Sequence, residues 1–292
     1  MVPARFAPLS FRERGGGREG KPSQGALIAR YAGNPSDPKR IPAMSDTRAL
    51  FTRQSDAYRA NRPTYDPALI AWLSQQAPDQ SLAWDCGCGT GQATTDLARH
   101  FRQVVGTDVS AQQLARAEPA PNIDYRCEPA EQTSLATRSV SLILVAQALH
   151  WFDLERFYAE VRRVSRPGGL LAVISYNRSS IAPEVDALVD HLYQDILGSY
   201  WAEERKHVEQ GYRTLPFPFE RIEVPPFTLD ADWDLARLLG YLESWSALGT
   251  YKSVHGTDPL DPLRERFQQA WGDPASTRRV SWPLTVNLGR VS

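Results

Sequence analysis

The segment from residue 82 to residue 101 constrains the fold of this 292-residue chain more than any other. A short apolar run ends at Asp85, glycines follow at alternate positions, and apolar residues then recur at helical spacing as far as Phe101. The three glycines are Gly87, Gly89 and Gly91. This order predicts a strand, a tight turn and a helix.

The glycine turn suits a cofactor that is bound through the main chain. Glycine tolerates a positive φ, and the missing Cβ lets a ligand approach the backbone closely. The helix that follows presents unpaired N–H groups and the positive end of its dipole, which suit an anionic group such as a carboxylate. A second strand over residues 104–109 places Asp108 at its carboxyl end. Asp108 lies 108 − 85 = 23 positions after Asp85, close to the ~20 expected before an acid that binds ribose hydroxyls.

The spacing of the glycines separates two classes of nucleotide-binding protein. The nicotinamide fingerprint is Gly-x-Gly-x-x-Gly, whereas this chain has Gly-x-Gly-x-Gly after Asp85, which disfavours a nicotinamide-dependent dehydrogenase. With Asp108 after the second strand, the pattern resembles the first motif of the class I S-adenosylmethionine-dependent methyltransferases. The resemblance implies S-adenosyl-L-methionine as the cofactor, held by Asp85, Gly87, Gly89, Gly91 and Asp108. A structural turn that binds nothing is the alternative.

The order of the apolar segments predicts an α/β protein. Together with the resemblance, it indicates a Rossmann-like, doubly wound, mostly parallel seven-stranded sheet with an antiparallel C-terminal hairpin and a helical cap. Further strands are expected at residues 123–127, 139–146 and 170–175, with the hairpin at 221–224 and 280–288. Helices are expected after the Asp66-Pro67 start signal and at residues 110–118, 154–164, 183–197 and 233–248, with a Pro-Gly-Gly turn at 166–169.

Four regions differ in composition or in predicted role. Residues 1–43 hold a glycine run and scattered arginines without sustained periodicity, which predicts a disordered extension or an upstream, non-native start before Met44. An arginine-rich transit peptide is the alternative, weakened by the acidic residues of the segment. We expect a helical lid over residues 44–80, the S-adenosylmethionine-binding core over 81–176, and a substrate cap with the closing strands over 177–292.

The region before the glycine turn carries a second family signature. Phe51, Ser55, Tyr58, Arg62 and Tyr65 are spaced as in the leader of small-molecule methyltransferases similar to trans-aconitate methyltransferase. In that family the leader folds over the cofactor pocket, so the resemblance assigns Tyr58 to the cofactor and Arg62 to the catalytic site. Arg62 would pair with a carboxylate, either of the acceptor or of the cofactor itself. An ordinary amphipathic helix with an exposed arginine is the alternative.

Two loops at the carboxyl ends of later strands complete the predicted site. The resemblance implies that Ala130 and Glu131 flank the adenine and that Gln147 also contacts the cofactor; a merely solvated Glu131 is the alternative. The pair His150-Trp151 is a feature of the same subfamily, and Trp151 is a candidate substrate contact. His150 is the candidate general base, because its unperturbed pKa lies near 6.5. A buried structural histidine is the alternative.

The C-terminal part of the chain is rich in tryptophan. Five of the eight tryptophans lie beyond residue 200, and they are Trp201, Trp233, Trp245, Trp271 and Trp282. We predict that this aromatic segment caps the acceptor pocket, with Trp245 as a substrate residue. Simple filling of the hydrophobic core is the alternative.

Composition disfavours several classes of function. The net charge of −1 shows no basic excess for nucleic acid, and no apolar run approaches the ~18 residues of a membrane span. Three cysteines argue against a disulfide framework. Cys86 and Cys88 lie inside the glycine turn without a further Cys/His pair at ligand spacing, so no metal is expected. We therefore expect a cytoplasmic monomer or weak homodimer.

The predicted activity is methylation of a small molecule, with O-methylation of a carboxylic acid as the favoured reaction. A carboxylate is already ionised at pH 7 and needs no base, whereas a hydroxyl, amine or acidic carbon does. One alternative is a quinone, sterol or other non-acid acceptor. Another is a protein that binds S-adenosylmethionine without turnover.

Overall fold

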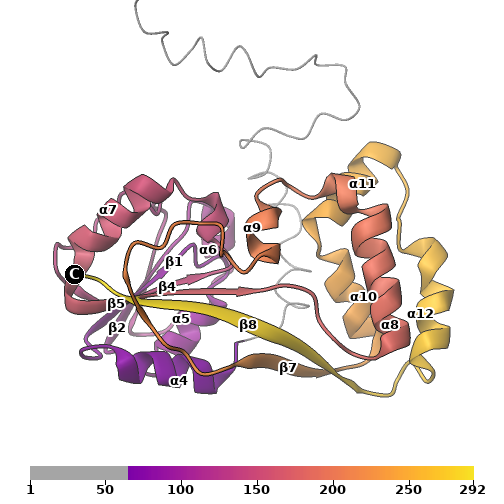
Figure 1. The fold of residues 1–292 in the computed structure, drawn as a ribbon, viewed down its shortest axis with the longest axis horizontal. Helices are drawn as coiled ribbons and strands as arrows, with labels where there is room; N and C mark the ends of the chain where they lie inside the picture. The colour runs from indigo at the N-terminus through magenta and orange to yellow at the C-terminus, as the bar shows by residue number, and fades with distance from the viewer. Residues whose placement is uncertain (1–64) are drawn as a thin grey trace, which may run out of the picture. The chain divides into compact units, whose positions relative to one another are not determined.

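Residues 65–292 are the part of the chain that the computed structural model describes (Figure 1). The predicted leader helix, with Tyr58 and Arg62, lies outside the described residues, as does the predicted boundary before Met44. The first described helix is α4, Pro67–Gln76, which begins where its start signal predicts. Asp66 caps it, because an Oδ1 atom accepts the Ala68 N–H at 2.8 Å.

An eight-stranded sheet forms the centre of the described residues. The strand order is β3-β2-β1-β4-β5-β8-β6, and β7 pairs with β8 off this path. Strands β1 to β5 run parallel, whereas β8 is antiparallel to β5, β6 and β7. The predicted α/β fold is confirmed, and one strand more than the predicted seven is present. The bounds are β1 Leu82–Cys86, β2 Gln103–Thr107, β3 Ile123–Arg126, β4 Val140–Ala146, β5 Ser165–Tyr176, β6 Glu220–Ile222, β7 Thr228–Trp233 and β8 Arg278–Arg290.

Successive side chains of the central strands point to opposite faces of the sheet. In β4, Leu142 belongs to one hydrophobic cluster and Ile143 to a second. Helices α4 and α5 (Gln92–Leu97) cover the first face, and α7 (Leu154–Val164) covers the second (Figure 1). Because helices cover both faces, β4 reads as a near-continuous apolar run.

Local sequence signals fix the ends of some of these elements and not of others. Helix α7 has the bounds predicted for residues 154–164. Helix α6, Ala111–Leu114, begins after Ser110 as expected but ends four residues before the predicted Glu118. The Ala115 N–H still donates to the Ala111 carbonyl, four residues back, but the N–H groups of Arg116 and Ala117 donate to carbonyls three residues back, which tightens the chain into a turn.

The predicted Pro-Gly-Gly turn at residues 166–169 lies inside β5 and does not precede it. The pairing of β5 with β4 shifts register between Val140 and Leu142, so the extra residues form an irregularity within the strand. Gly168 takes a φ of 75° at this point, which explains why glycine suits the position.

Most of the C-terminal helices gather at one end of the sheet, and one short helix, α9, lies apart from them beside the strands (Figure 1). Their bounds are α8 Pro183–Asp190, continued by the π-helical turn η2 His191–Ile196, then the 3-10 turn η3 Gly198–Tyr200, α9 Arg205–Glu209, α10 Leu235–Glu243, α11 Ser246–His255, the 3-10 turn η4 Asp261–Leu263 and α12 Arg264–Trp271. The helix predicted over 183–197 is confirmed as α8 with η2. The closing strands predicted near 221 and 280 are confirmed as β6 and β8, although they are distant in sequence and form no hairpin.

The helix predicted over residues 233–248 is wrong as a single element. Trp233 ends β7, and Asp234 begins α10 by accepting the Arg237 N–H at 2.8 Å. The Ser244 hydroxyl then donates to the Tyr241 carbonyl at 2.6 Å, a local bond that competes with helix propagation. Trp245 is extended, with φ −71° and ψ 132°, and α11 starts afresh after it.

Tryptophan side chains fill the core of this region. Trp233, Trp245, Trp271 and Trp282 are buried, and Trp201 is half-buried. The Trp282 ring lies 4.9 Å from that of Trp233 and 5.6 Å from that of Tyr241, in edge-on arrangements. These rings therefore form part of the hydrophobic core, and Trp245 among them is 5% exposed.

Two kinds of feature are absent from the described residues. Between residues 65 and 292, helices long and apolar enough to cross a membrane are absent. The same residues contain no group of three or more His, Cys, Asp or Glu side chains placed to hold a metal ion.

Candidate active site

The glycine turn after β1 is tied to the neighbouring strand β2. The N–H groups of Gly87 and Cys88 both donate to the Thr107 carbonyl, at 2.8 Å and 3.0 Å. The Gly91 N–H donates to the Cys88 carbonyl at 2.9 Å, which closes the turn. These bonds fix the main chain at the carboxyl edge of the sheet.

Gly91 and Gly89 show why the turn requires glycine. Gly91 has a φ of 78°, and a Cβ there would lie 2.3 Å from the hydroxyl of Tyr125 in β3. Gly89 has a φ of 56°, and a Cβ there would meet nothing within 4 Å. The turn is therefore closed by Tyr125 at one glycine and faces open space at another, as a cradle for a ligand would.

Asp85 lies at the end of β1 beneath this turn and is 1% exposed. Its Oδ2 atom accepts the Thr94 hydroxyl at 2.6 Å, while Oδ1 has no hydrogen-bond partner in the described part of the chain. Burial, and secondarily the charge of Asp108, raise the pKa of the Asp85 carboxyl to about 7. A buried acceptor left unpaired at the edge of a site favours a cationic or hydrogen-bond-donating ligand.

Asp108 follows β2 directly, and two main-chain groups orient its carboxylate. Oδ2 accepts the Gly89 N–H at 2.9 Å, and Oδ1 accepts the Ser110 N–H at 2.8 Å. Burial nevertheless raises the pKa of Asp108 above its ordinary value. Each carboxylate oxygen can accept more than one hydrogen bond, so the group retains capacity for hydroxyl donors.

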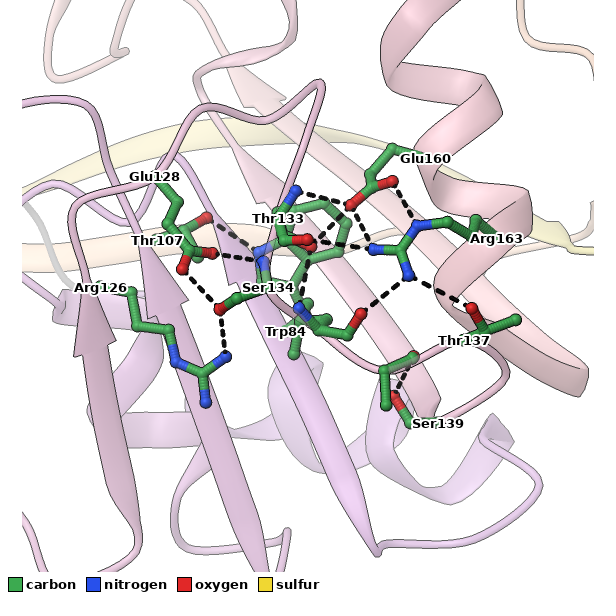
Figure 2. Close-up of polar contacts among 12 residues, drawn as sticks. Trp84, Thr107, Arg126, Glu128, Thr133, Ser134, Thr137, Ser139, Glu160 and Arg163 are labelled. Atoms are coloured by element: carbon green, nitrogen blue, oxygen red, sulfur yellow. Dashed lines mark hydrogen bonds and ion pairs between the residues drawn. The ribbon is translucent and has the colours of Figure 1, made fainter.

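The loop after β3 is held against α7 by a network of charged groups (Figure 2). Glu160 Oε1 accepts both the N–H and the hydroxyl of Thr133 at 2.7 Å. Arg163 pairs with Glu160 at 2.7 Å and also donates to the Thr133 carbonyl at 3.2 Å. The same loop carries Ala130, which is buried, and Glu131, whose Oε1 accepts the Asp153 N–H at 2.9 Å. Glu131 thus joins this loop to the start of α7, a contact absent from the prediction.

A strained residue ends β4. Gln147 has a φ of 59°, which is unusual for a residue with a side chain. Its N–H donates to the Ile174 carbonyl at 2.9 Å, and its Nε2 donates to the Tyr176 carbonyl at 2.8 Å. Two bonds to β5 therefore hold Gln147 at the edge where the glycine turn also lies.

His150 follows in the 3-10 turn η1, Leu149–Trp151. Its Nδ1 lies 2.8 Å from the hydroxyl of Tyr212, and its ring centroid lies 4.7 Å from that of Trp151. Burial lowers the pKa of His150 to about 3, and the neighbouring Arg205 guanidinium and His207 add to this effect. The imidazole is therefore neutral at pH 7.

The carboxyl ends of β1, β2 and β4 bring the predicted residues Asp85, Asp108 and Gln147 to one edge of the sheet. Trp245 belongs to the aromatic cluster of the C-terminal part, with ring centroids 5.5 Å from Tyr193 and 5.6 Å from Trp201.

Three residues at the site were missed by the sequence analysis: Thr94, Tyr125 and Tyr212. Thr94 gave a signal, because it is a polar residue on the buried face of α5, and its hydroxyl bonds Asp85. For Tyr125, the sequence gave no signal beyond its position in a predicted strand. Tyr212 lies 62 positions from His150, and no local pattern marks that pairing.

Comparison with known proteins agrees with this geometry. A family model described as a methyltransferase domain matches residues 84–173. A candidate methyltransferase from Dictyostelium discoideum is 34% identical over 79% of this chain and 89% of its own length. An uncharacterised methyltransferase from Mycobacterium tuberculosis is 36% identical over 61% of this chain and 69% of its own. The structure of a candidate type II methyltransferase from Anaeromyxobacter dehalogenans has a TM-score of 0.75 at 45% identity, covering 79% of this chain and 98% of that one.

Proposed function

This chain belongs to the class I S-adenosylmethionine-dependent methyltransferases, and we propose that the acceptor of the methyl group is a small carboxylic acid. The enzyme uses S-adenosylmethionine, which supplies an electrophilic methyl group on a sulfonium. The finer assignment, to small-molecule enzymes similar to trans-aconitate methyltransferase, is part of the proposal.

The residues at the sheet edge fit this cofactor. The unpaired Oδ1 of buried Asp85 suits the ammonium of the methionine portion, and the Asp108 carboxylate suits the two ribose hydroxyls. The open space beside Gly89 admits a ligand close to the main chain. We assign these roles as proposals, together with Gly87, Gly91, Ala130, Glu131 and Gln147 as further cofactor contacts.

The state of His150 carries the proposal of a carboxylic acid acceptor. A general base works best with a pKa near the operating pH, whereas burial lowers the pKa of this imidazole to about 3. Its neighbour Tyr212 has its phenol pKa raised by burial and is equally unsuited to proton transfer near neutrality. A carboxylate arrives already ionised, so its reaction needs neither group as a base.

In this proposal the protein positions the acceptor and excludes water. Trp151 and its neighbours in η1 supply apolar surface beside His150. Arg62, assigned from the sequence as a charge partner for a carboxylate, lies outside the described residues. The lid over residues 44–80, the cap over 177–292 with Trp245 at the substrate, a cytoplasmic location and a monomer or weak homodimer stay predictions.

A screen of acceptors tests the proposal. We would first titrate S-adenosylhomocysteine by calorimetry, then assay methyl transfer to small carboxylic acids and to their primary amides. Base-labile methyl esters from the acids alone, formed at a rate that is flat between about pH 6 and pH 9, are the expected result. Transfer to a quinone, sterol or other neutral acceptor, with a rate that follows an ionisation of His150, would replace the proposed acceptor and make His150 the base.

A further inference from the structure

Arg205, the first residue of α9, holds a guanidinium that the fold orients with aromatic groups. Its Cζ lies 5.0 Å from the ring centroid of Trp201 and 5.8 Å from that of Tyr193. Its Nε donates to the Tyr193 hydroxyl at 3.1 Å. A planar guanidinium held by stacking and by one bond at Nε presents its two Nη atoms in a fixed direction.

This guanidinium has no carboxylate partner between residues 65 and 292. The nearby Arg178 pairs with Asp190, and Arg264 pairs with Glu243 at 2.7 Å. Glu209 lies one helical turn after Arg205, but its carboxylate accepts the Tyr193 hydroxyl instead. Within the same residues, neither Nη atom of Arg205 has a hydrogen-bond acceptor. A half-buried arginine without an anion is uncommon, because charged groups away from water are normally paired.

Helix α9 places this cation at the reacting end of the site. It packs against η1, which carries His150, and against β5. Figure 1 shows α9 beside the carboxyl end of β5, the edge to which the cofactor residues also belong. The positive charge of Arg205 contributes to the lowered pKa of His150, which agrees with this closeness.

We propose that Arg205 binds the carboxylate of the methyl acceptor through its Nη donors, and so selects acids over neutral molecules. The inference rests on the carboxylic acid acceptor proposed above and names the residue that recognises it. A lone pair of the carboxylate forms the new O–CH₃ bond while the S–CH₃ bond breaks and its electrons return to sulfur. The products are a methyl ester and a neutral thioether, and no proton moves.

Trp201 and Tyr193 complete this recognition without contributing charge. They hold the guanidinium by its faces and its Nε, so the ordering of its long side chain is largely achieved before the acid binds. Lysine cannot reproduce a planar, stacked, two-donor arrangement, so Arg205→Lys should restore the charge but only part of the selectivity.

The test compares Arg205→Met with Lys206→Met, which removes a positive charge from the next residue of α9. Lys206 is 68% exposed and pairs with Glu203, so it controls for net charge and for helix disturbance. We would measure KM and kcat for trans-aconitate, benzoate and octanoate and for any neutral acceptor the wild type uses, with S-adenosylhomocysteine affinity from calorimetry. Arg205→Met should raise KM for the acids roughly 10- to 100-fold, since a charge-assisted bond is lost. The affinity of Arg205→Met for S-adenosylhomocysteine should stay within twofold of that of the wild type. The KM of Arg205→Lys for the acids should lie between the values of the wild type and of Arg205→Met.

Three outcomes overturn the inference. The first is an acid KM for Arg205→Met within twofold of that for Lys206→Met. The second is a parallel loss of acid turnover, neutral-acceptor turnover and cofactor affinity, which would make Arg205 a structural clip for Trp201 and Tyr193. The third is a wild type that methylates neutral acceptors and no acids, which removes the proposed function itself. If Arg205→Met does not fold, the comparison of Arg205→Lys with wild type decides, and an equal KM for the acids rejects the inference.

Discussion

The parallel part of the molecule, residues 82–176, and the C-terminal part, residues 177–292, are built by different means. In the first, strands alternate side chains between two aliphatic clusters, and neighbouring strands are joined by short helical connections. In the second, large aromatic rings pack edge-on, and arginines lie over tryptophan and tyrosine faces. The parallel part therefore holds the residues proposed for the cofactor at its strand ends, and the C-terminal part supplies aromatic surface and charge.

The comparison teaches that the structure of the parallel part is determined mainly by local sequence. The structure of the C-terminal part depends on pairing between segments that are distant in sequence. The strands that close the sheet pair with partners far along the chain, as Leu229 does with Trp282 and Arg221 with Gly289. Because β8 pairs with β5 as well as with β7, both parts share one sheet. We expect them to unfold as one cooperative unit.

The largest expected effect tests that cooperativity. Trp282→Ala in the C-terminal part and Phe157→Ala on the buried face of α7 should each lower the free energy of unfolding by about 3–5 kcal/mol, because both side chains are fully buried. Each variant should give a single urea transition, followed by circular dichroism and by tryptophan fluorescence. Transitions that do not coincide between the two probes would show that the parts unfold separately.

Trp282→Phe is the control for this pair. It keeps an aromatic ring and removes an indole N–H that has no acceptor in the described part of the chain. Trp282→Phe should lower the free energy of unfolding by about 1 kcal/mol, well below the effect of the alanine variant. The loss of packing is partly offset because an unpaired polar group is removed.

The next effect separates ligand binding from backbone strain. Gly89→Ala and Gly256→Ala both force alanine into a positive φ, of 56° and 69°, and neither new Cβ meets another atom within 4 Å. Each should cost about 1 kcal/mol of stability. Gly89→Ala should also weaken S-adenosylhomocysteine binding roughly 100-fold in calorimetry, because the methyl group occupies the space beside the turn. Equal affinities in the two variants would remove Gly89 from the cofactor site.

A smaller effect concerns the buried carboxyl in the parallel part. Asp85 has a pKa of about 7 when folded, against 3.8 for the unperturbed group, so the folded chain binds more protons between these values. Its contribution to stability is complete below pH 3.8 and is lost as the pH rises through about 7. Asp85→Asn, which cannot ionise, should therefore be more stable than wild type at pH 8, by roughly 1–3 kcal/mol in urea unfolding.

The same variant sharpens the assignment of Asp85 to the cofactor. Its affinity for S-adenosylhomocysteine should fall, because an amide replaces the charge that faces the ammonium. Binding to the wild type at pH 6.5 should release protons, measurable by calorimetry in buffers of different ionisation enthalpy. Tighter binding by Asp85→Asn, with no proton release in the wild type, would contradict the pairing.

The smallest effect compares helix caps in the two parts. Asp234 caps α10 through a 2.8 Å bond to the Arg237 N–H, and Asp153 caps α7 through a 3.3 Å bond to the Arg156 N–H. Each replacement by alanine should cost about 1 kcal/mol, with Asp234→Ala the larger because its bond is shorter. The midpoint of thermal unfolding measures both. A larger loss for Asp153→Ala than for Asp234→Ala would contradict this ordering of the two caps.

The parallel part was predictable because its signals are local. The helical spacing of Phe157, Val161 and Val164 predicted both ends of α7, and the apolar run predicted β4. Strand β7 carried a signal too, since Leu229, Ala231 and Trp233 alternate with acids, but a helix was predicted to begin at Trp233. The alternating pattern identifies a strand only once its pairing with β8 is known.

Some features of the candidate site were likewise predictable from local sequence, and others depend on contacts between distant segments. Asp85 and Asp108 lie at one edge of the sheet, as the order of strands predicted, because the carboxyl ends of β1 and β2 carry them there. The contact between His150 and Tyr212 spans 62 positions, and the burial that lowers the pKa of His150 comes from chain folded far from it in sequence. Sequence reasoning therefore found the candidate imidazole without its protonation state.

The position of β8 has a consequence for synthesis of the protein. Strand β5 ends at Tyr176, and its antiparallel partner begins at Arg278, which is 278 − 176 = 102 positions later. At the usual ribosomal rate this interval lasts roughly 5–20 s. Until it passes, the nascent chain presents an apolar strand edge with unpaired backbone groups, a template for pairing with other chains. The need for chaperones and the formation of inclusion bodies should therefore depend on how quickly β8 is synthesised and pairs with β5.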